Sequence, residues 1–485
     1  MSFDKIKLVG ALDSPQNGPA KPGMTLEDFP DVGLLKTQQR EAFERMLEYV
    51  EGRSPHKMFL LKGFAGTGKT FTITTLVKYL MEKQPCAIAM TAPTNKAVRV
   101  LSKMASYKHD RLNYRTIHSL LGLKPVVDGF GHQEFKRDFN SPASVEEQKI
   151  LIVDEVSQLE DSLFEMLGPY VQKGLKIIFM GDPYQIPPVN KEDCIPLSEA
   201  GQHKYEIGVA VLEEVVRQAA DNPIIAATMV IRNKMLSPDP LFSEQTHLLP
   251  DGRGLLVLEK SKGGSAKLLE IVEQVFLSDE FKEDPDTVKV LAWTNDAVRK
   301  MNSIVRRIIY PDSTQKIEIG ERLLAQSAVF DGDDILLTTN EECEVIDFKI
   351  KEDIVNGGQL VIKYYQAKVR SFDRPEHECS IKIVHDESEK TYENILDLML
   401  KSAKNKQQGT FLAKQAWIEY YGFMKLYADM VYNYALTAHR AQGSTYGTTI
   451  VLSENIRANK KVFERNRILY TACSRPKNLL VLLRN

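Results

Sequence analysis

The stretch Gly63-Phe64-Ala65-Gly66-Thr67-Gly68-Lys69-Thr70 decides the fold, because it matches the pattern G-x-x-x-x-G-K-(S/T). The apolar run Met58 to Leu61 precedes it and predicts a buried strand, and a sequence compatible with a helix follows it. Glycines at this spacing let backbone amides turn toward phosphate oxygens, and the start of the helix adds positive potential. We therefore expect this loop to cradle the phosphates of a nucleotide, with Lys69 as a cation and the hydroxyl of Thr70 as a ligand of Mg²⁺.

A second segment supplies carboxylates. Leu151 to Val153 predict a buried strand that ends in Asp154 and Glu155. The chain leaves the sheet at that point, so both side chains can reach one crevice at its carboxyl edge. Asp154 is then suited to hold Mg²⁺, and Glu155 to orient or deprotonate an attacking water. An acidic pair after a strand is by itself more often a solvated turn, but the phosphate loop upstream favours the catalytic interpretation.

A third strand leads to a candidate sensor. The apolar run Ile177 to Met180 is followed by Gly181-Asp182-Pro183-Tyr184-Gln185 and then by two prolines that stiffen the loop. A neutral amide at this sheet edge can contact both a γ-phosphate and a water, so Gln185 could report whether the nucleotide has been hydrolysed. The alternative is a rigid connector without a chemical role.

Short apolar runs recur along the chain and leave room for a helix between them. They lie at Ala87 to Met90, Ile150 to Val153, Ile177 to Met180, Leu255 to Leu258, Val288 to Trp293, Thr449 to Leu452 and Leu479 to Leu483. Such alternation predicts parallel sheets with helices and right-handed crossovers. We therefore expect an α/β fold with two such domains in tandem.

Breaks in this alternation divide the chain. Residues 1–30, rich in Pro, Gly and Asp, predict a flexible tail. The first α/β domain is expected over 31–212, interrupted at 108–148 by an irregular stretch that forms a hairpin or an ordered loop. The second is expected over 213–319 and 429–485. Between them, 320–428 shows short strand-like runs at 360–362, 368–370 and 380–384 separated by Asp, Pro and Gly, which predicts an inserted β module.

Composition narrows the function classes. The 485 residues, 43% hydrophobic and 26% charged, are typical of a globular protein of about three domains. Lys and Arg total 63 against 65 Asp and Glu, which gives a net charge of −2. This near-neutral net charge does not indicate a polyanion partner. Five scattered cysteines without a C-x-x-C pair argue against a disulfide framework or a zinc site and favour a reducing compartment. No apolar run approaches the roughly 20 residues that a membrane helix needs.

These blocks, in this order, resemble the superfamily 1 helicases over most of the chain from Leu35 onward. The other segments that carry the resemblance are Leu35 to Phe43, Thr91 to Ala97, Thr116 to Leu121, Glu214 to Gln218, Ala292 to Asn295, Leu436 to Gly443 and Leu469 to Arg475. The likeness is to the Dda and RecD-like branch. It implies two tandem RecA-like P-loop domains, with a small hairpin inserted in the first and an SH3-like β module inserted in the second.

The resemblance also implies roles for single residues at the nucleotide. Gln39 would read the adenine of ATP, and Gln442 and Gly443 would contact the nucleotide from the second domain. Arg217 and Arg475 would reach across the cleft and stabilise the charge on the transferred phosphoryl group. The alternative for Gln39, Arg217 and Arg475 is that each is an ordinary surface residue.

Contacts to a nucleic-acid strand form a second group of implied roles, in phosphate binding and base stacking without sequence readout. The residues concerned are Pro93, Thr94, His118, Thr294, Asn295, Thr437 and His439. Each alone would more often be a turn or cap residue. A basic track could run through Lys96, Arg99, Lys103, Arg299, Lys300, Arg306, Arg307, Lys404, Lys406 and Lys414.

The interrupting stretch 108–148 occupies the place where Dda-like enzymes have a pin that splits the duplex. An aromatic tip stacked on the last base pair would stop the duplex from following the translocating strand. The candidates for this tip are Phe130, Phe135 and Phe139.

The resemblance therefore implies an ATP- and Mg²⁺-dependent DNA helicase that moves 5′ to 3′ on single-stranded DNA and unwinds duplexes. Its expected partners are single-stranded and forked DNA, with replication or repair proteins in addition and no membrane. We expect it to act as a monomer in the cytoplasm, the host cytoplasm if it is phage-encoded. Two alternatives stay open: an RNA-directed superfamily 1 translocase, which would differ in its tolerance of the 2′-hydroxyl, and a nucleotide-switched adaptor that does not unwind.

Overall fold

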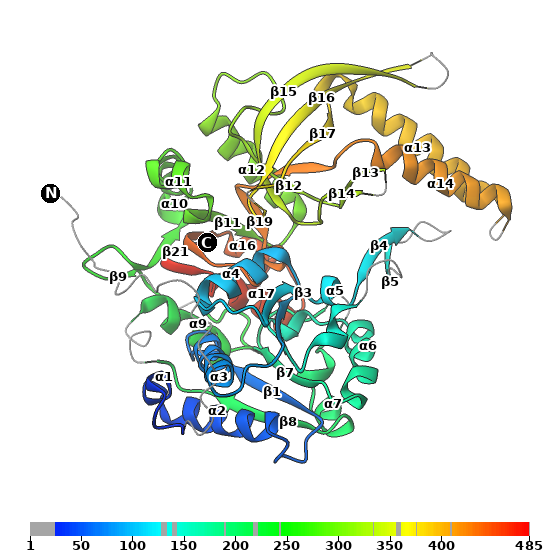
Figure 1. The fold of residues 1–485 in the computed structure, drawn as a ribbon. Helices are drawn as coiled ribbons and strands as arrows, with labels where there is room; N and C mark the ends of the chain where they lie inside the picture. Colours follow the sequence, from blue (N-terminus) through cyan, green and yellow to red (C-terminus); the bar gives the residue numbers. More distant parts are fainter. Residues whose placement is uncertain are drawn as a thin grey trace.

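The structure is a computed structural model that describes residues 25–127, 133–137, 143–188, 191–216, 222–241, 244–332, 334–355, 360–374, 376–407 and 410–484. Most of the predicted tail, residues 1–30, lies outside this part of the chain. Three sheets organise the rest (Figure 1).

The first sheet has six parallel strands in the order β3-β2-β6-β7-β1-β8. The strands are β1 (Met58–Gly63), β2 (Ile88–Ala92), β3 (Leu112–Thr116), β6 (Ile150–Val153), β7 (Lys176–Gly181) and β8 (Ile207–Leu212). Its main helices are α2 (Thr37–Val50), α3 (Lys69–Lys83), α4 (Asn95–Ala105), α6 (Asp161–Gln172) and α7 (Glu199–Lys204), with short helices α1 (Pro30–Gly33) and α5 (Ile117–Leu120).

The second sheet repeats this plan in the order β19-β11-β20-β21-β10-β9, parallel except for β9. Its strands are β9 (His247–Leu248), β10 (Gly254–Glu259), β11 (Val288–Ala292), β19 (Ala435–Thr437), β20 (Tyr446–Val451) and β21 (Pro476–Arg484). Its helices are α9 (Pro223–Asn233), α10 (Gly264–Phe276), α11 (Asp279–Glu283), α12 (Asn295–Ile309), α15 (Ala438–Ala441), α16 (Ser453–Arg457) and α17 (Val462–Cys473). The predicted α/β fold with two tandem parallel sheets is confirmed.

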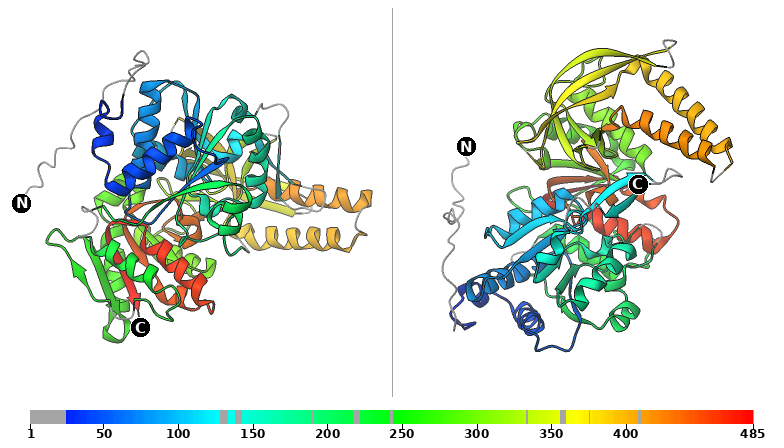
Figure 2. Two further views of the ribbon diagram at one scale, coloured as in Figure 1. Left: turned by 90° about the horizontal axis from the view of Figure 1, so that it is seen from below. Right: turned by 45° about the vertical axis from the view of Figure 1, so that its right-hand side comes forward.

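The third sheet is antiparallel, in the order β17-β16-β15-β12-β18. It is built from β12 (Arg322–Ala325), β15 (Glu342–Val355), β16 (Leu360–Ser371), β17 (Glu378–Val384) and β18 (Met430–Tyr432), with the hairpin β13 (Val329–Asp331) and β14 (Asp334–Leu337) beside it. Two helices, α13 (Glu389–Asn405) and α14 (Phe411–Lys425), project together from the body of the molecule in all three views (Figures 1 and 2).

Local predictions fail in two places. The stretch that begins at Lys108 is not irregular throughout, because β3 pairs in parallel with β2 and completes the first sheet; a smaller hairpin, β4 (Leu123–Val127) and β5 (Gln133–Arg137), follows it. The runs at 360–362 and 368–370 are not separate short strands but parts of β16, which pairs along most of its length with β15. The helices α13 and α14 are not anticipated by the sequence analysis.

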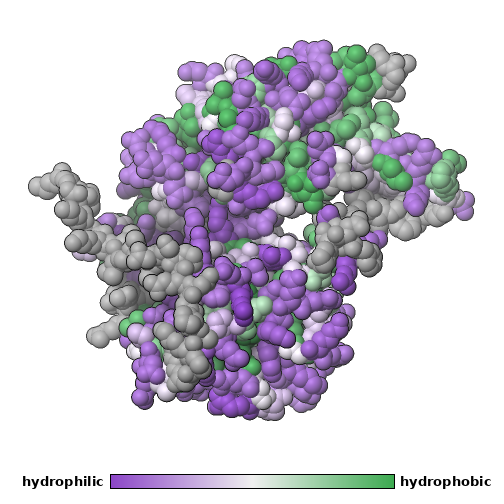
Figure 3. All heavy atoms as spheres, viewed as in Figure 1, coloured by the Kyte–Doolittle hydropathy of each residue, from purple (hydrophilic) through white to green (hydrophobic). Residues whose placement is uncertain are grey.

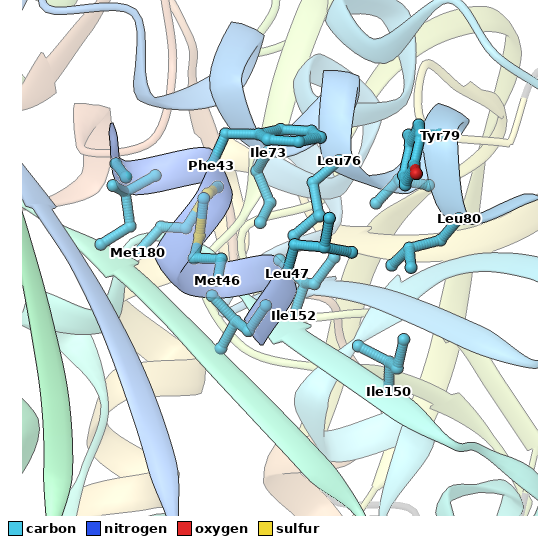
Figure 4. Close-up of a cluster of buried hydrophobic side chains, with 14 of the residues drawn as sticks. Phe43, Met46, Leu47, Ile73, Leu76, Tyr79, Leu80, Ile150, Ile152 and Met180 are labelled. Carbon is cyan, nitrogen blue, oxygen red and sulfur yellow. The ribbon is translucent and has the colours of Figure 1, made fainter. Parts of the chain in front are cut away.

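The core of the first sheet shows why its elements form (Figure 4). Phe43 and Met46 of α2, which recur at helical spacing, are fully buried between the sheet and α3. They meet Leu76 of α3, Ile152 of β6 and Met180 of β7 in one cluster. Full burial of each such side chain contributes about 1.5–3 kcal/mol. This core fixes the strand ends that carry the candidate site.

The outer surface differs from this core. Hydrophilic side chains cover most of the face shown in Figure 3, and hydrophobic ones gather mainly toward the end where α13 and α14 project. Leu398, Phe411, Leu412 and Ile418 are among the exposed apolar residues of these two helices. No helix in the described ranges combines the length and the apolarity needed to cross a bilayer.

Candidate functional site

The loop between β1 and α3 has the conformation that a phosphate cradle needs. Gly66 and Gly68 have φ angles of 79° and 81°, in the left-handed region that favours glycine. A Cβ atom on Gly63 would lie 2.8 Å from Oγ1 of Thr67, so the turn has no room for a side chain there. Lys69 Nζ donates to the carbonyl of Gly63 at 2.8 Å, which holds the ammonium over the loop.

Gln39 lies against this loop from α2. Its Nε2 donates to the carbonyl of Thr67 at 2.9 Å, and its Oε1 accepts from the amide of Lys36 at 3.0 Å. Both ends of the side-chain amide therefore have protein partners, and a Cβ on Gly68 would lie 2.3 Å from Nε2. The structure places Gln39 next to the nucleotide loop, where it supports the loop backbone; adenine reading stays a prediction.

Asp154 and Glu155 lie at the carboxyl end of β6. The amide of Asp154 donates to the carbonyl of Thr91 at 2.8 Å, and the amide of Glu155 donates to Oδ1 of Asp154 at 2.8 Å. Glu155 has a φ of 51°, a left-handed conformation that costs free energy in a residue other than glycine. Burial, and then the charge of Glu155, raise the pKa of Asp154; burial also raises the pKa of Glu155, while Lys69 opposes both shifts.

The donor atoms at this place fit Mg²⁺. Thr70, the second residue of α3, and Asp154 offer a hydroxyl and a carboxylate, and hard oxygen donors with room for phosphate and water are what Mg²⁺ prefers. Burial beside Glu155 disfavours the negative charge of Asp154 and raises its pKa, so a further positive charge would stabilise the ionised carboxylate there. Thr70 and Asp154 would therefore hold the ion.

Arg475 enters the same site from the second sheet. It follows α17, is 5% exposed, and is anchored by donation from Nε to the carbonyl of Thr471 at 2.9 Å and from Nη1 to that of Ser444 at 3.2 Å. Its charge lowers the pKa of Glu155, which is the leading effect opposing the rise caused by burial. A Cβ on Gly443 would lie 3.6 Å from Cγ of Glu155, so that segment also closes on the carboxylate.

Gln185 and Gln442 meet directly at the interface between the first and second sheets. Nε2 of Gln442 donates to Oε1 of Gln185 at 3.0 Å and to Oγ of Ser157 at 2.8 Å, and both glutamines are buried. A hydrogen bond from Gln442 also lowers the pKa of Glu155. Gln442, expected at the nucleotide, here joins the loops that follow β6 and β7 to the second sheet.

Three predicted residues lie outside the described residues: Arg217, Phe130 and Phe139. Of the pin candidates only Phe135, on β5, can therefore be placed. It is 43% exposed, and its ring centroid lies 4.2 Å from that of His118. The hairpin is thus attached through an aromatic contact to one of the predicted strand-binding residues.

The predicted nucleic-acid contacts occupy equivalent positions on the two sheets. The sequence A-x-T-N-x-A-V-R occurs at 92–99 and again at 292–299, a repeat that the sequence analysis missed. Thr94 and Thr294 cap α4 and α12, accepting from the amides three residues on at 3.2 and 3.3 Å, and Asn95 and Asn295 begin these helices. Thr437 likewise caps α15.

The two histidines predicted to contact the strand also lie just after threonines that cap short helices. His118 lies two residues after Thr116, which caps α5, and His439 lies two residues after Thr437. Burial lowers the pKa of both imidazoles, which favours neutral rings suited to stacking. A cavity of about 180 Å³ joins the two parts of the site, since Pro93 and His118 line it together with Asp154 and Glu155.

Two members of the expected basic track, Lys96 and Arg99, do not lie on an exposed basic surface. Lys96 is only 7% exposed, and its Nζ donates to Glu342 Oε1 at 2.6 Å and to Asp286 Oδ1 at 2.9 Å. Arg99, one turn later on α4, donates to the carbonyl of Phe372 at 2.7 Å. These side chains attach the first sheet to the inserted module and are not an exposed cationic surface.

Glu342→Gln is expected to lower the thermal unfolding midpoint markedly, because it leaves the buried Lys96 with Asp286 as its remaining carboxylate. Breaking a buried ion pair from one side costs about 3–5 kcal/mol. Glu352→Gln, at an exposed position on the same strand, is the control and should leave the midpoint unchanged. Scanning calorimetry measures the midpoints, and equal values for the two variants would contradict this prediction.

Two further residues at the cleft were not singled out from the sequence. Arg467 of α17 is 3% exposed and donates from Nε to the carbonyl of Gln185 at 2.7 Å and from Nη2 to that of Pro183 at 2.7 Å. Tyr470, one turn later, hydrogen-bonds the phosphate loop. Their spacing on one helix face before Arg475 is the signal that could have identified them.

Comparison with known protein families gives two matches. Residues 34–242 match the AAA domain, and residues 432–483 match the UvrD-like helicase C-terminal domain. The first match contains the phosphate loop and both carboxylates, and the second contains Gln442, Tyr470 and Arg475.

Curated relatives match nearly the whole chain. It is 25% identical over 434 residues to the ATP-dependent DNA helicase dda of Enterobacteria phage T4, covering 87% of this chain and 91% of the relative. It is 26% identical over 460 residues to the ATP-dependent RecD2 DNA helicase of Deinococcus radiodurans, covering 92% of this chain and 50% of the relative. An uncharacterised protein of Acanthamoeba polyphaga mimivirus is 25% identical over 499 residues, covering 91% and 98%.

Solved structures with a similar chain course include two Pif1 helicases. That of Candida albicans has a TM-score of 0.46 at 18% identity, covering 93% of this chain and 94% of the other. That of Bacteroides, in complex with ADP-AlF3 and ssDNA, has a TM-score of 0.44 at 15% identity, covering 91% of each chain.

Proposed function

Because the chain belongs to the superfamily 1 helicases of the Dda, RecD and Pif1 branch, we propose that it is an ATP-dependent DNA helicase. In this proposal it moves 5′ to 3′ along single-stranded DNA and unwinds the duplex ahead of it. The observation that carries the proposal is the direct contact of the second sheet with the loops that follow β6 and β7, where Gln442 donates to Gln185 and Ser157 and Gly443 lies beside Glu155. Hydrolysis can then depend on how the two sheets approach each other.

The chemistry assigns a separate task to each residue at the cleft. The amides of the loop after Gly63 bind the phosphates, and Lys69 neutralises the charge that develops on them. Glu155 accepts a proton from the attacking water, and Arg475 stabilises the transferred phosphoryl group from the opposite side. Mg²⁺, held by Thr70 and Asp154, would polarise the phosphate oxygens.

Strand movement would follow from the repeated helix starts. Pro93, Thr94 and His118 would hold the strand on the first sheet, and the equivalent residues on the second sheet are Thr294, Asn295, Thr437 and His439. Closure on ATP shortens the distance between the two sets, and reopening after hydrolysis leaves the strand advanced. The contacts suit backbone and base faces, so the movement needs no particular sequence.

The organisation of the chain is part of the same proposal. The first RecA-like domain would span 31–212 with the hairpin insertion, and the second 213–319 and 429–485 with the β module at 320–428. We also propose single-stranded and forked DNA, with replication or repair proteins, as partners of a monomer that acts in the cytoplasm. The five thiols are free, which fits a reducing compartment.

Unwinding of a tailed DNA duplex tests the proposal. We expect ATP-dependent unwinding from a 5′ tail but not from a 3′ tail, because the branch sets the polarity, and no unwinding by Lys69→Ala. Unwinding from the 3′ tail alone would retain the motor and reject the polarity. Equal stimulation of hydrolysis by RNA would favour the RNA translocase, and hydrolysis that no nucleic acid accelerates would reject the helicase in favour of an adaptor.

A further inference from the structure

The hydroxyl of Tyr470 lies between two functional segments of the first sheet, although Tyr470 belongs to α17 of the second. The amide of Ala65 in the phosphate loop donates to this hydroxyl at 3.2 Å. The hydroxyl donates in turn to Oδ2 of Asp182, at the end of β7, at 2.6 Å. Tyr470 and Asp182 are each 1% exposed, so the hydrogen bond between them is shielded from bulk water.

The direction of these bonds is fixed by the surroundings. Burial, and then the charge of Asp182, raise the pKa of Tyr470 well above its ordinary value, so the hydroxyl keeps its proton. A protonated hydroxyl can donate to one group and accept from another at the same time. Oδ1 of Asp182 accepts from the amide of Tyr184 at 3.0 Å, which leaves Oδ2 directed at the hydroxyl.

The helix that carries Tyr470 is also anchored to the loop that follows β7. Arg467, three residues earlier, donates to the carbonyls of Pro183 and Gln185 and to Oδ1 of Asp193 at 2.9 Å. Arg475 lies five residues after Tyr470, just past the end of α17. The hydroxyl therefore joins the phosphate loop and the end of β7 to the helix that leads to Arg475.

Aromatic packing surrounds this contact. The ring of Tyr184 lies 5.6 Å from that of Phe64 in the phosphate loop and 6.3 Å from that of Tyr470. The guanidinium of Arg232 on α9 lies 4.2 Å from the centre of the Phe64 ring. The rings hold the phosphate loop against the second sheet, while the Tyr470 hydroxyl supplies the directional contact.

We propose that Tyr470 is a positioning residue that couples the phosphate loop to Arg475. This inference rests on the proposed function and deepens it. The hydroxyl fixes the Ala65 amide and the Asp182 carboxylate relative to α17, so that filling of the loop and placement of the arginine occur together. It does not touch the reacting atoms, and its loss would misplace the arginine without removing it.

Tyr470→Phe in the full chain tests this role. We expect the kcat of DNA-stimulated ATP hydrolysis to fall roughly 10- to 100-fold, the effect of a small misplacement of reacting groups, with a much smaller change in the KM for ATP. The ratio of DNA-stimulated to basal hydrolysis should fall with it, since closure no longer positions Arg475. An unchanged ratio would overturn the coupling role.

Tyr49→Phe is a closely matched control. Tyr49 is also fully buried, its hydroxyl accepts from the amide of Ile177 in β7 at 3.0 Å, and it donates to the carbonyl of Lys57, just before β1, at 3.0 Å, so neither contact reaches the second sheet. It should lower the unfolding midpoint about as much as Tyr470→Phe and leave the stimulation ratio unchanged. If both variants reduce the ratio equally, the effect is structural and the proposal fails.

A double-variant cycle with Asp182→Asn locates the coupling. Residues that act through one hydrogen bond give non-additive effects, so the double variant should lose little more of the stimulation ratio than Tyr470→Phe alone. Additive losses would overturn the proposed link through Asp182. If the unaltered protein shows no DNA-stimulated hydrolysis, the proposed function fails and this inference with it. If the unaltered protein shows this stimulation and Tyr470→Phe shows it to the same extent, the inference alone fails.

Discussion

Arg475→Ala is expected to lower the kcat of ATP hydrolysis by about 1,000-fold or more, the effect of removing an arginine that stabilises phosphoryl transfer. Arg475 is buried, and its bonds to Thr471, Ser444 and Ser474 use three of its five N–H groups. They orient the guanidinium while its charge acts on Glu155. The KM for ATP should change much less, because the contact strengthens in the transition state. Steady-state hydrolysis with saturating single-stranded DNA measures both constants.

Two variants show whether the guanidinium itself is required. Arg475→Lys keeps the charge but loses the planar fork, so most of the activity should stay lost. Arg465→Ala removes an arginine of α17 whose contacts, to the carbonyls of Asn459 and Pro238, stay on the second sheet. Its kcat should match that of the unaltered protein. Activity of Arg475→Ala within tenfold of that level would contradict the assigned role.

The arrangement of the nucleotide site could be predicted from sequence because it depends on strand ends. The phosphate loop follows β1, the carboxylates follow β6 and Gln185 follows β7. Each strand is a short apolar run, and carboxyl ends of parallel strands converge at one sheet edge. What the runs alone do not determine is the strand order, which places β7 between β6 and β1.

The contacts between distant segments could not be predicted in this way. Lys96 has the pattern of an exposed basic residue, and its partner Glu342 is 246 residues away on a strand of another sheet. The strand β3 carries polar residues at an edge, so its sequence lacks the apolar run that identifies the central strands. Pairing of this kind depends on tertiary packing and not on local pattern.

The contacts of Arg467 and Tyr470 with the first sheet were only partly predictable from the sequence. Both lie in a helix that fits the room left between the apolar runs that end at Leu452 and begin at Leu479, but those runs do not say which face of the helix meets another domain. In the structure the two side chains, one turn apart, bind the loop after β7 and the phosphate loop. The interface between the two sheets thus determines which residues of this helix reach the candidate site.

Glu155→Gln is expected to lower the kcat of hydrolysis by about 100- to 10,000-fold, the range for loss of a general base. The amide preserves shape but cannot accept the proton of the attacking water. Single-turnover hydrolysis and nucleotide binding, measured separately, should show lost chemistry with retained binding. Glu160→Gln is the control, because Glu160 is an exposed carboxylate that lines the same cavity.

The pH profile gives this prediction a second, independent readout. Burial raises the pKa of Glu155, so its protonated form persists to a higher pH than in an exposed carboxylate. Hydrolysis by the unaltered protein should therefore decline on acidification at a higher pH than an ordinary carboxylate would cause, and recover as Glu155 ionises. In Glu155→Gln the residual rate should lose this decline. A full acid limb, unchanged from the unaltered protein, would mean that another group accepts the proton.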